Sequence, residues 1–309
     1  MKTMLLIYNP HSGKGKAAAH LPMFVETFTA QDWLVTVRPT RFAGDAEALC
    51  AEIGANYDRV VCCGGDGTLH EVVTGLMSRT ERPELACLPA GSTNDFGQNL
   101  ALPRSYKALA ETAAAGFPAP CDMGRFNGKP FVYVAAFGAF TDVTYDTPQS
   151  FKNLFGHTAY LLNGIARLPS ITSFPLHVEY DGGTLDDEYV LGIVSNTISV
   201  GGFKGLLGTD IKLNDGLFEV VLVKMPQNAT ELHKIINSAL EKNYAGNALI
   251  TTFRTSRIRF TGPSDVAWTL DGEYGGTVSE AEIENCRSAH TVVRGAPEET
   301  LSGKKEKKD

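Results

Sequence analysis

Apolar runs and amphipathic stretches alternate along the first third of the chain. The apolar runs predict strands at four places, namely residues 4–8, 33–37, 59–63 and 85–88. Apolar side chains at helical spacing predict helices at residues 45–53 and 106–115. Strands that alternate with helices are typical of a mostly parallel sheet with helices on both faces. Residues 1–121 are therefore predicted to form a doubly wound α/β domain.

The rest of the chain is rich in predicted strands. They cover residues 131–136, 174–180, 189–195, 218–223, 250–253, 257–261, 267–270 and 291–294. Two helical stretches interrupt them, at residues 151–168 and 229–240. We interpret residues 122–295 as an antiparallel β-sandwich domain. Residues 296–309 form a tail with a lysine-rich end, which is expected to be disordered or, as an alternative, to contact anionic lipid.

Composition excludes some classes of protein. Of the 309 residues 43% are hydrophobic and 20% charged, which is ordinary globular composition. The net charge of −7 argues against a broad basic surface, so no nucleic-acid partner is expected. The six cysteines follow no disulfide or zinc spacing, and we find no signal peptide and no membrane span. We expect reduced thiols and a cytoplasmic location.

A glycine-rich loop at residues 64–68, Gly-Gly-Asp-Gly-Thr, follows the third predicted strand. After it, Leu69, Val72, Val73 and Leu76 have the spacing of a helix face, so the segment predicts strand, turn and helix. Glycines allow close backbone approach, and a helix N-terminus suits a phosphate. A carboxylate in such a loop is useful beside Mg²⁺ or as a proton acceptor. The alternative is a tight turn with a helix-capping aspartate.

Two further loops have a similar design. Residues 89–97 place glycine, hydroxyls, an amide and Asp95 after the fourth strand, and residues 9–15 place Ser12, Gly13 and Lys14 after the first. Loops that follow parallel strands gather at one edge of the sheet, where α/β folds bind ligands. We therefore expect Asp66 and Asp95 to face one pocket. The first loop lacks Walker A spacing, and by itself it also fits an ordinary turn.

Acidic residues also mark two turns of the second domain. Asp271 and Glu273 lie two residues apart, so on a strand they would share one face and could point together into a cleft. The alternative is a solvated hairpin turn, because Asp-Gly is a hairpin signal. At Asp215, in Asn-Asp-Gly, a carboxylate and nearby carbonyls could hold a hard cation such as Mg²⁺, although a plain turn has the same spacing.

The ordered motifs resemble the diacylglycerol kinase catalytic-domain family, most closely the soluble lipid kinases of Gram-positive bacteria. They are Asn-Pro-x-Ser-Gly at 9–13, Thr40 before Gly-Asp-Ala at 44–46, the 64–68 loop with Glu71, Gly-Ser-Thr-Asn-Asp-Phe at 91–96, Asp-Met-Gly at 122–124, Asn-Asp-Gly at 214–216 and Asp-Gly-Glu-Tyr-Gly-Gly at 271–276. The likeness covers about residues 3–295. His70 departs from it, since Asn is common there.

The resemblance implies a fold and a set of site residues. The fold is a nucleotide-binding domain similar to NAD kinases and phosphofructokinases, followed by a β-sandwich, with the last strand and tail returning to the first domain. Nucleotide would be held by Asn9, Pro10, His11, Ser12, Gly13, Thr40, Gly65, Asp66, Gly67, Thr68, Leu69, His70, Glu71 and Thr93. A structural Mg²⁺ would take the Asp215 side chain and the carbonyls of Lys212 and Leu217. Waters and this ion would link a cross-domain network of Asp66, Asp95, Asp122, Asp215 and Glu273. The catalytic residues would be Asp66, Asp271 and Glu273, with Asp271 favoured as base.

These observations predict an ATP- and Mg²⁺-dependent lipid kinase that phosphorylates the hydroxyl of diacylglycerol to give phosphatidic acid. The alternatives are a kinase for phosphatidylglycerol or a sphingoid base, an NAD kinase, and a non-catalytic nucleotide sensor. The protein would work at the membrane surface from the cytosol. Residues 151–168 are the candidate interface helix, with a core-packed helix as the alternative. A homodimer is left open.

Overall fold

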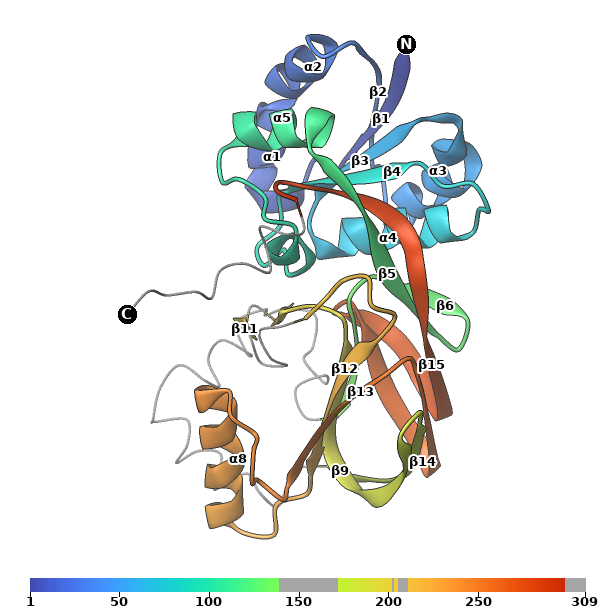
Figure 1. The fold of residues 1–309 in the computed structure, drawn as a ribbon. Helices are drawn as coiled ribbons and strands as arrows, with labels where there is room; N and C mark the ends of the chain where they lie inside the picture. The colour runs from blue at the N-terminus through green and yellow to red at the C-terminus, as the bar shows by residue number, and fades with distance from the viewer. Residues whose placement is uncertain (139–171, 202, 205–210, 298–309) are drawn as a thin grey trace. The chain divides into compact units, whose positions relative to one another are not determined.

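The computed structural model describes residues 1–138, 172–201, 203–204 and 211–297 (Figure 1). The chain forms two compact units. Residues Met1–Met123 and the segment from Arg287 onward make the first unit, and Gly124–Cys286 makes the second. The chain passes from one unit to the other twice, within strand β5 (Phe117–Phe126) and within strand β15 (Glu273–Arg294). The first unit is therefore discontinuous in sequence.

The first unit contains a parallel sheet. Its strands lie in the order β2, β1, β3, β4, with the end of β15 beside β4. The first four strands are β1 (Lys2–Tyr8), β2 (Trp33–Pro39), β3 (Arg59–Gly64) and β4 (Glu84–Pro89). All four sequence-predicted strands of this domain are present, each slightly longer than predicted. The order of these strands reverses between β1 and β3, because β2 lies on one side of β1 and the later strands on the other.

Helices cover both faces of this sheet (Figure 1). Helices α2 and α5 pack together on one face, and α3 and α4 pack together on the other. The helices are α1 (Lys16–Ala19), α2 (Leu21–Thr29), α3 (Asp45–Ile53), α4 (Asp66–Met77) and α5 (Tyr106–Ala115), with short 3-10 helices at Ser12–Gly15, Gly54–Asn56 and Phe96–Asn99. Strands with both faces covered are apolar throughout, which explains the unbroken apolar runs in the sequence.

Alternation along the strands divides the core of the first unit. Met4 and Leu6 of β1 lie in the cluster that includes Phe24 and Phe28 of α2. Leu5, which points the other way along the same strand, is equally buried. In α4, the residues predicted to form the buried face, Leu69, Val72, Val73 and Leu76, are all buried. The predicted doubly wound α/β domain is confirmed.

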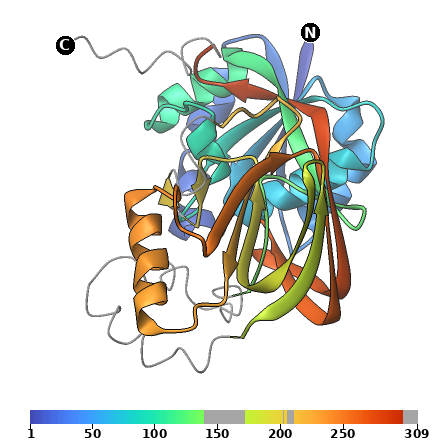
Figure 2. The same ribbon diagram turned by 60° about the horizontal axis from the view of Figure 1, so that its bottom comes forward.

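The second unit is built from antiparallel strands (Figure 2). They are β6 (Lys129–Phe131), β7 (Val134–Gly138), β8 (Phe174–Tyr180), β9 (Gly183–Ser195), β12 (Phe218–Lys224), β13 (Ile250–Thr255) and β14 (Arg257–Leu270), with β15 and the small pair β10 (Ser199–Val200) and β11 (Phe203–Lys204). Helix α8 (Ala229–Glu241) lies beside this sheet and contacts it through Ile235.

Aromatic side chains fill the core of the second unit. The ring of Trp268 lies 5.1 Å from Phe126, 4.8 Å from Phe137 and 5.1 Å from Phe260, measured between centroids. Such tilted and edge-on pairs add stabilisation to that of the buried apolar area. The packed aromatic core and the antiparallel pairing agree with the predicted β-sandwich, which the comparisons below also confirm.

Three predicted strands of the second unit differ from the observed ones. The predicted strand 131–136 is interrupted, because Val132 and Tyr133 donate their backbone N–H groups to the Asp271 carboxylate instead of to a neighbouring strand. The two strands predicted at 257–261 and 267–270 are one strand, β14, whose pairing with β15 shifts register between Thr261 and Val266.

One predicted helix is not tested by the fold. The stretch 151–168 lies outside the described residues. Among the helices that are described, none is both long enough and apolar enough to cross a membrane.

Candidate active site

Three loops of the first unit begin at the carboxyl edge of the parallel sheet. The sheet reverses its strand order between β1 and β3, and such switch points are where open α/β sheets bind ligands. The loop after β1 and the glycine loop after β3 start at this point, and Asn9 N–H donates to the Cys63 carbonyl at 2.9 Å. The loop after β2 starts beside them, since Thr40 N–H donates to the Tyr8 carbonyl at 2.9 Å.

The glycine loops touch each other through their backbones. A Cβ atom added to Gly91 would lie 2.6 Å from the Cα of Gly65, and one added to Gly13 would lie 2.2 Å from the carbonyl oxygen of Ala90. Gly13 also has a φ of +58°, a conformation that favours glycine. The structure thus brings together the three loops that the sequence motifs had singled out after β1, β3 and β4.

Two asparagines hold these loops in shape. The Asn9 amide donates to the Thr68 hydroxyl at 3.2 Å, and its oxygen accepts from the N–H of His11 at 2.9 Å. Asn94, at a φ of +54°, accepts from Gly91 N–H and donates to the Gly91 carbonyl, both at 2.8 Å. Asn94 was not among the predicted site residues. The signal was present, since asparagine is the side chain that tolerates positive φ and bonds its own turn.

Asp66 is the first residue of helix α4, where Gly65 is the N-cap. Burial, together with the nearby charge of Asp95, raises the pKa of its carboxyl to about 6. Backbone N–H groups of residues 94–96 act in the opposite direction. A carboxylate that is partly desolvated beside a second carboxylate is suited to take a proton or to approach a cation. That Asp66 and Asp95 face one pocket remains a prediction.

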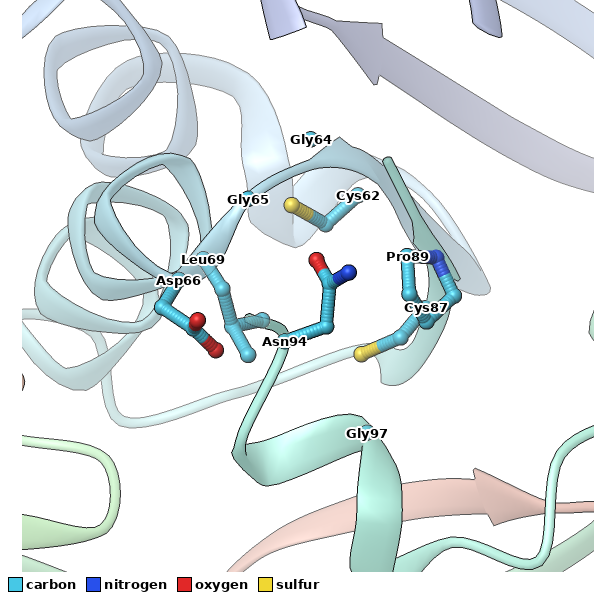
Figure 3. A pocket seen from close by; sticks show the side chains of 9 residues that line it. All are labelled: Cys62, Gly64, Gly65, Asp66, Leu69, Cys87, Pro89, Asn94 and Gly97. Carbon is cyan, nitrogen blue, oxygen red and sulfur yellow. The ribbon is translucent and has the colours of Figure 1, made fainter. Parts of the chain in front are cut away.

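A small cavity lies behind these loops (Figure 3). Its volume is about 20 Å³, enough for about one water molecule. The lining residues are Cys62, Gly64, Gly65, Asp66, Leu69, Cys87, Pro89, Asn94 and Gly97. Burial raises the pKa of the Cys87 thiol to about 12 and that of Cys62 well above its usual value. Both thiols are therefore protonated, which agrees with the expected structural role of the cysteines.

Glu71 makes contacts that the sequence did not predict. Its two carboxylate oxygens accept hydrogen bonds from the backbone N–H groups of Gly44 and Ala46, at 2.9 and 3.2 Å. These groups lie at the N-terminus of α3, directly after the loop that contains Thr40. The contact ties the start of α3, which follows the loop with Thr40, to helix α4, which begins in the glycine loop. Direct contact of Glu71 with nucleotide remains a prediction.

The other predicted nucleotide residues lie on the loops after β1, β2 and β4 and on the first turns of α4. Thr68 and Leu69 are buried, His11 is exposed, and the rest are half-buried: Pro10, Ser12, Gly13, Thr40, Gly67, His70 and Thr93. Half-buried loop residues are accessible to a ligand. Their contacts with nucleotide remain a prediction.

The predicted carboxylate network has members in both units. Asp95 and Asp122 are fully buried in the first unit, and Asp122 accepts a hydrogen bond from Ser288 N–H at 2.7 Å. That bond ties β5 to β15 within this unit. Asp215 and Glu273 belong to the second unit. The complete network remains a prediction.

Asp271 and Gly272 form the two-residue turn between β14 and β15. Their φ values are +53° and +89°, as the common Asp-Gly hairpin turn requires. Asp271 is 3% exposed, and its carboxylate accepts hydrogen bonds from the backbone N–H groups of Val132, Tyr133 and Val134 at 2.7, 2.9 and 3.2 Å. The expectation that Asp271 and Glu273 share a strand face is wrong, because Asp271 is in the turn. Glu273 is exposed.

The turn at residues 212–217 contains the three residues predicted to hold a cation. Asp215 is half-buried and its Oδ1 accepts from Leu217 N–H at 3.1 Å, while Lys212 is exposed. Among the described residues, no group of three or more His, Cys, Asp or Glu side chains is arranged to hold a metal. The predicted site uses one carboxylate and two backbone carbonyls, so this finding about side-chain clusters does not test it.

The comparisons with known proteins cover nearly the whole chain. The family described as "Diacylglycerol kinase catalytic domain" matches residues 3–126, and "YegS C-terminal NAD kinase beta sandwich-like domain" matches residues 137–291. The two matches define a two-domain lipid kinase with an α/β catalytic domain and a β-sandwich. A solved structure from Bacillus anthracis str. Sterne, proposed to be a diacylglycerol kinase, aligns with a TM-score of 0.78 at 26% identity, covering 95% of this chain and 97% of that one.

Relatives identify the family. The diacylglycerol kinase of Bacillus subtilis (strain 168) is 35% identical over 95% of this chain and 97% of its own length. That of Staphylococcus aureus (strain MRSA252) is 34% identical over 89% of this chain and 87% of its own. The chain belongs to the diacylglycerol kinase family. It is a lipid kinase, and membership of a kinase family implies ATP as the phosphoryl donor.

Proposed function

We propose that the protein transfers the γ-phosphate of ATP to the hydroxyl of diacylglycerol, forming phosphatidic acid, with Mg²⁺ as the required cation. The single observation that best supports this is the backbone contact between Gly65 and Gly91. Only glycines permit it, and it brings a helix N-terminus and two glycine loops together at the switch point of the sheet. The relatives named as diacylglycerol kinases support the choice of lipid.

Phosphoryl transfer depends on positioning and on charge stabilisation rather than on covalent chemistry by the protein. In our proposal, the loops at residues 9–13 and 64–68 and Thr93 hold the phosphates of ATP. Asp66 is the catalytic carboxylate at this site. Its partly desolvated position, which raises its pKa to about 6, supports a role beside the reacting phosphate.

We assign the acceptance of the lipid hydroxyl proton to Glu273 and a positioning role to Asp271. Three backbone N–H groups already occupy the Asp271 carboxylate, which leaves it little capacity to accept a proton. Glu273 is exposed, one residue beyond the same turn. This reverses the assignment that the family resemblance favoured.

The 212–217 turn is the proposed holder of Mg²⁺, through the Asp215 carboxylate and the carbonyls of Lys212 and Leu217. Mg²⁺ takes oxygen ligands, keeps several waters and binds through one or two carboxylates, which this turn can offer. Glu219, on the strand that follows, has a buried carboxylate oxygen with no hydrogen-bond partner among the described residues, and such an oxygen fits the same chemistry. When bound, the ion would supply positive charge to the carboxylates around it.

The lipid substrate requires access to a membrane surface, so we propose peripheral association with membranes. Residues 151–168 are the proposed contact. Paired Leu161→Glu and Leu162→Glu substitutions should abolish sedimentation with vesicles while the folded state is retained. Loss of the folded state would instead support a core-packed helix.

One assay distinguishes diacylglycerol kinase activity from the alternative functions. The purified chain is incubated with γ-labelled ATP, with and without MgCl₂, and with diacylglycerol in mixed micelles, phosphatidylglycerol, a sphingoid base, or NAD. Label in phosphatidic acid, dependent on Mg²⁺, is the expected result. Label in another lipid would change the substrate, label in NAD would change the class of kinase, and no label in any acceptor would favour a nucleotide sensor.

A further inference from the structure

Glu219 is a buried carboxylate in an otherwise apolar strand. In β12, Phe218, Val220 and Leu222 face the aromatic core of the second unit, and Val221 and Val223 face the cluster contacted by α8. Glu219 lies on the latter face by alternation. Its side chain is 8% exposed. A charged residue at such a position needs partners for both carboxylate oxygens.

The described residues supply a hydrogen-bond partner for only one of these oxygens. Oε1 accepts from Nε of Arg254, its cross-strand neighbour on β13, at 3.1 Å. The neighbour on the other side is Ser195 of β9, whose hydroxyl donates to the Tyr133 carbonyl. Within the described part of the chain, Oε2 of Glu219 is buried and has no hydrogen-bond partner. This buried acceptor can be satisfied by a water or a cation.

A second carboxylate, Asp215, lies in the turn that leads directly into β12, the strand that carries Glu219. The charge of Asp215 acts unfavourably on that of Glu219, while Arg254 acts favourably. With two carboxylates and one guanidinium, this group has a formal charge of −1. A divalent cation at the Asp215 turn would reverse the sign of that charge. Bound waters of the cation are also the donors that a buried carboxylate oxygen lacks.

We propose that Glu219 is part of the cation site at the Asp215 turn, where its Oε2 accepts a hydrogen bond from a water bound to the ion. The inference rests on the proposed role of that turn in holding Mg²⁺. Arg254 then limits the affinity of the site, because it neutralises half of the carboxylate charge. Glu219 is a positioning residue in this scheme and does not touch the phosphate or the lipid.

The test measures Mg²⁺ binding to the full chain without ATP or lipid. Isothermal titration with MgCl₂ gives the affinity, and the melting temperature with and without MgCl₂ gives an independent readout. Glu219→Gln should weaken Mg²⁺ binding by roughly 10–100-fold, the usual cost of losing an outer-shell partner. The matched control, Glu179→Gln, removes an exposed carboxylate of the same unit and should leave the affinity unchanged.

A second variant should act in the opposite direction. Arg254→Gln removes the positive charge and should tighten Mg²⁺ binding if Glu219 belongs to the site. In Mg²⁺-free buffer, Glu219→Gln should melt at the same temperature as the parent or higher, because it removes a buried charge. A normal Mg²⁺ affinity in Glu219→Gln would overturn the inference.

The experiment also distinguishes this inference from the proposal on which it rests. Asp215→Asn should abolish the Mg²⁺ response. If the parent chain shows no response to MgCl₂, the proposed cation role of the turn fails, and the inference fails with it. If Asp215→Asn abolishes binding while Glu219→Gln and Arg254→Gln leave it unchanged, only the role of Glu219 fails.

Discussion

The Oδ1 atom of Asp271 accepts a hydrogen bond from the backbone N–H of Tyr133 at 2.9 Å. With the neighbouring bonds from Val132 and Val134, this contact anchors the segment between β6 and β7 to the β14–β15 turn. A carboxylate in this position has a structural role that its exposed neighbour Glu273 does not have. Substitutions of the two residues should therefore have different effects on stability and on turnover.

We expect Asp271→Asn to lower both stability and turnover, and Glu273→Gln to lower turnover alone. Asn keeps the shape of the side chain and tolerates the positive φ, but its NH₂ group cannot accept from a backbone N–H. The lost bonds should cost about 1–3 kcal/mol. Glu273→Gln should reduce turnover by roughly 10²–10⁴-fold with an unchanged melting temperature, since it removes a proton acceptor.

Melting curves and initial rates on the same preparations check this prediction. The assignment would have to be reversed if Glu273→Gln kept substantial turnover while Asp271→Asn folded normally and had none.

Asp66→Asn should lower turnover by at least ~100-fold, the scale expected when a charged group acting in the transition state is lost. The fold should remain intact. Because the pKa of Asp66 is raised to about 6, its charge is unfavourable in the folded state above that pH, and the variant should melt no lower than the parent at pH 7.5. The exposed Asp32→Asn serves as the control. Turnover near that of the parent, at saturating ATP and Mg²⁺, would remove Asp66 from the catalytic residues.

Glu71→Gln should raise the KM for ATP more than it lowers kcat. The substitution removes one of two acceptors for Gly44 and Ala46 N–H, which loosens the start of α3 and the loop before it. A loss of about 1 kcal/mol in nucleotide binding corresponds to roughly a fivefold rise in KM. Glu47→Gln, an exposed change on α3, is the control. Equal effects of both substitutions would contradict a positioning role for Glu71.

His290 should make the protein less stable in acid. Burial and the charge of Arg82 lower its pKa from 6.5 to about 4. Between these two pH values the unfolded chain binds a proton that the folded chain does not, so stability falls as the pH falls. Across the whole range between the two pKa values, this residue should lower the free energy of unfolding by about 3 kcal/mol.

Denaturation of the parent and of His290→Leu, at intervals from pH 7.5 to pH 4.5, measures this contribution. The variant should show a weaker loss of stability toward acid pH, whereas the exposed His233→Gln should behave as the parent. Parallel curves for all three proteins would show that another group is responsible.

Features with local signals were predictable from the sequence. The α/β order followed from apolar spacing, and the loops at residues 9–13, 64–68 and 91–96 followed from glycines placed after strands. The Asp-Gly pair at 271–272 is a hairpin-turn signal, and it forms a hairpin turn in the structure. Strand alternation, which predicts a shared face for Asp271 and Glu273, does not continue through residues of positive φ.

Features that depend on distant partners were not predictable. Glu71 contacts Gly44, 27 positions away, and nothing in the local sequence of either residue indicates the pair. The break between β6 and β7 similarly depends on Asp271, which is 138 positions from Tyr133. Glu219 did give a local signal, a lone acid in an apolar strand, but its unmatched oxygen is visible only once Arg254 and Ser195 are placed beside it.

Strand β15 has a consequence for the synthesis of the protein. Its Val292 pairs with Leu85 of β4, so the parallel sheet is completed by residues that come after the whole second unit in the sequence. Domains usually fold as they leave the ribosome, beginning with the N-terminal one. Here the N-terminal unit cannot close the open edge of β4 until Val292, which is far along the chain from Leu85, has been synthesised. A nascent chain that stops after Cys286 would expose that edge to pairing with other chains, so premature termination should favour aggregation over a functional fragment.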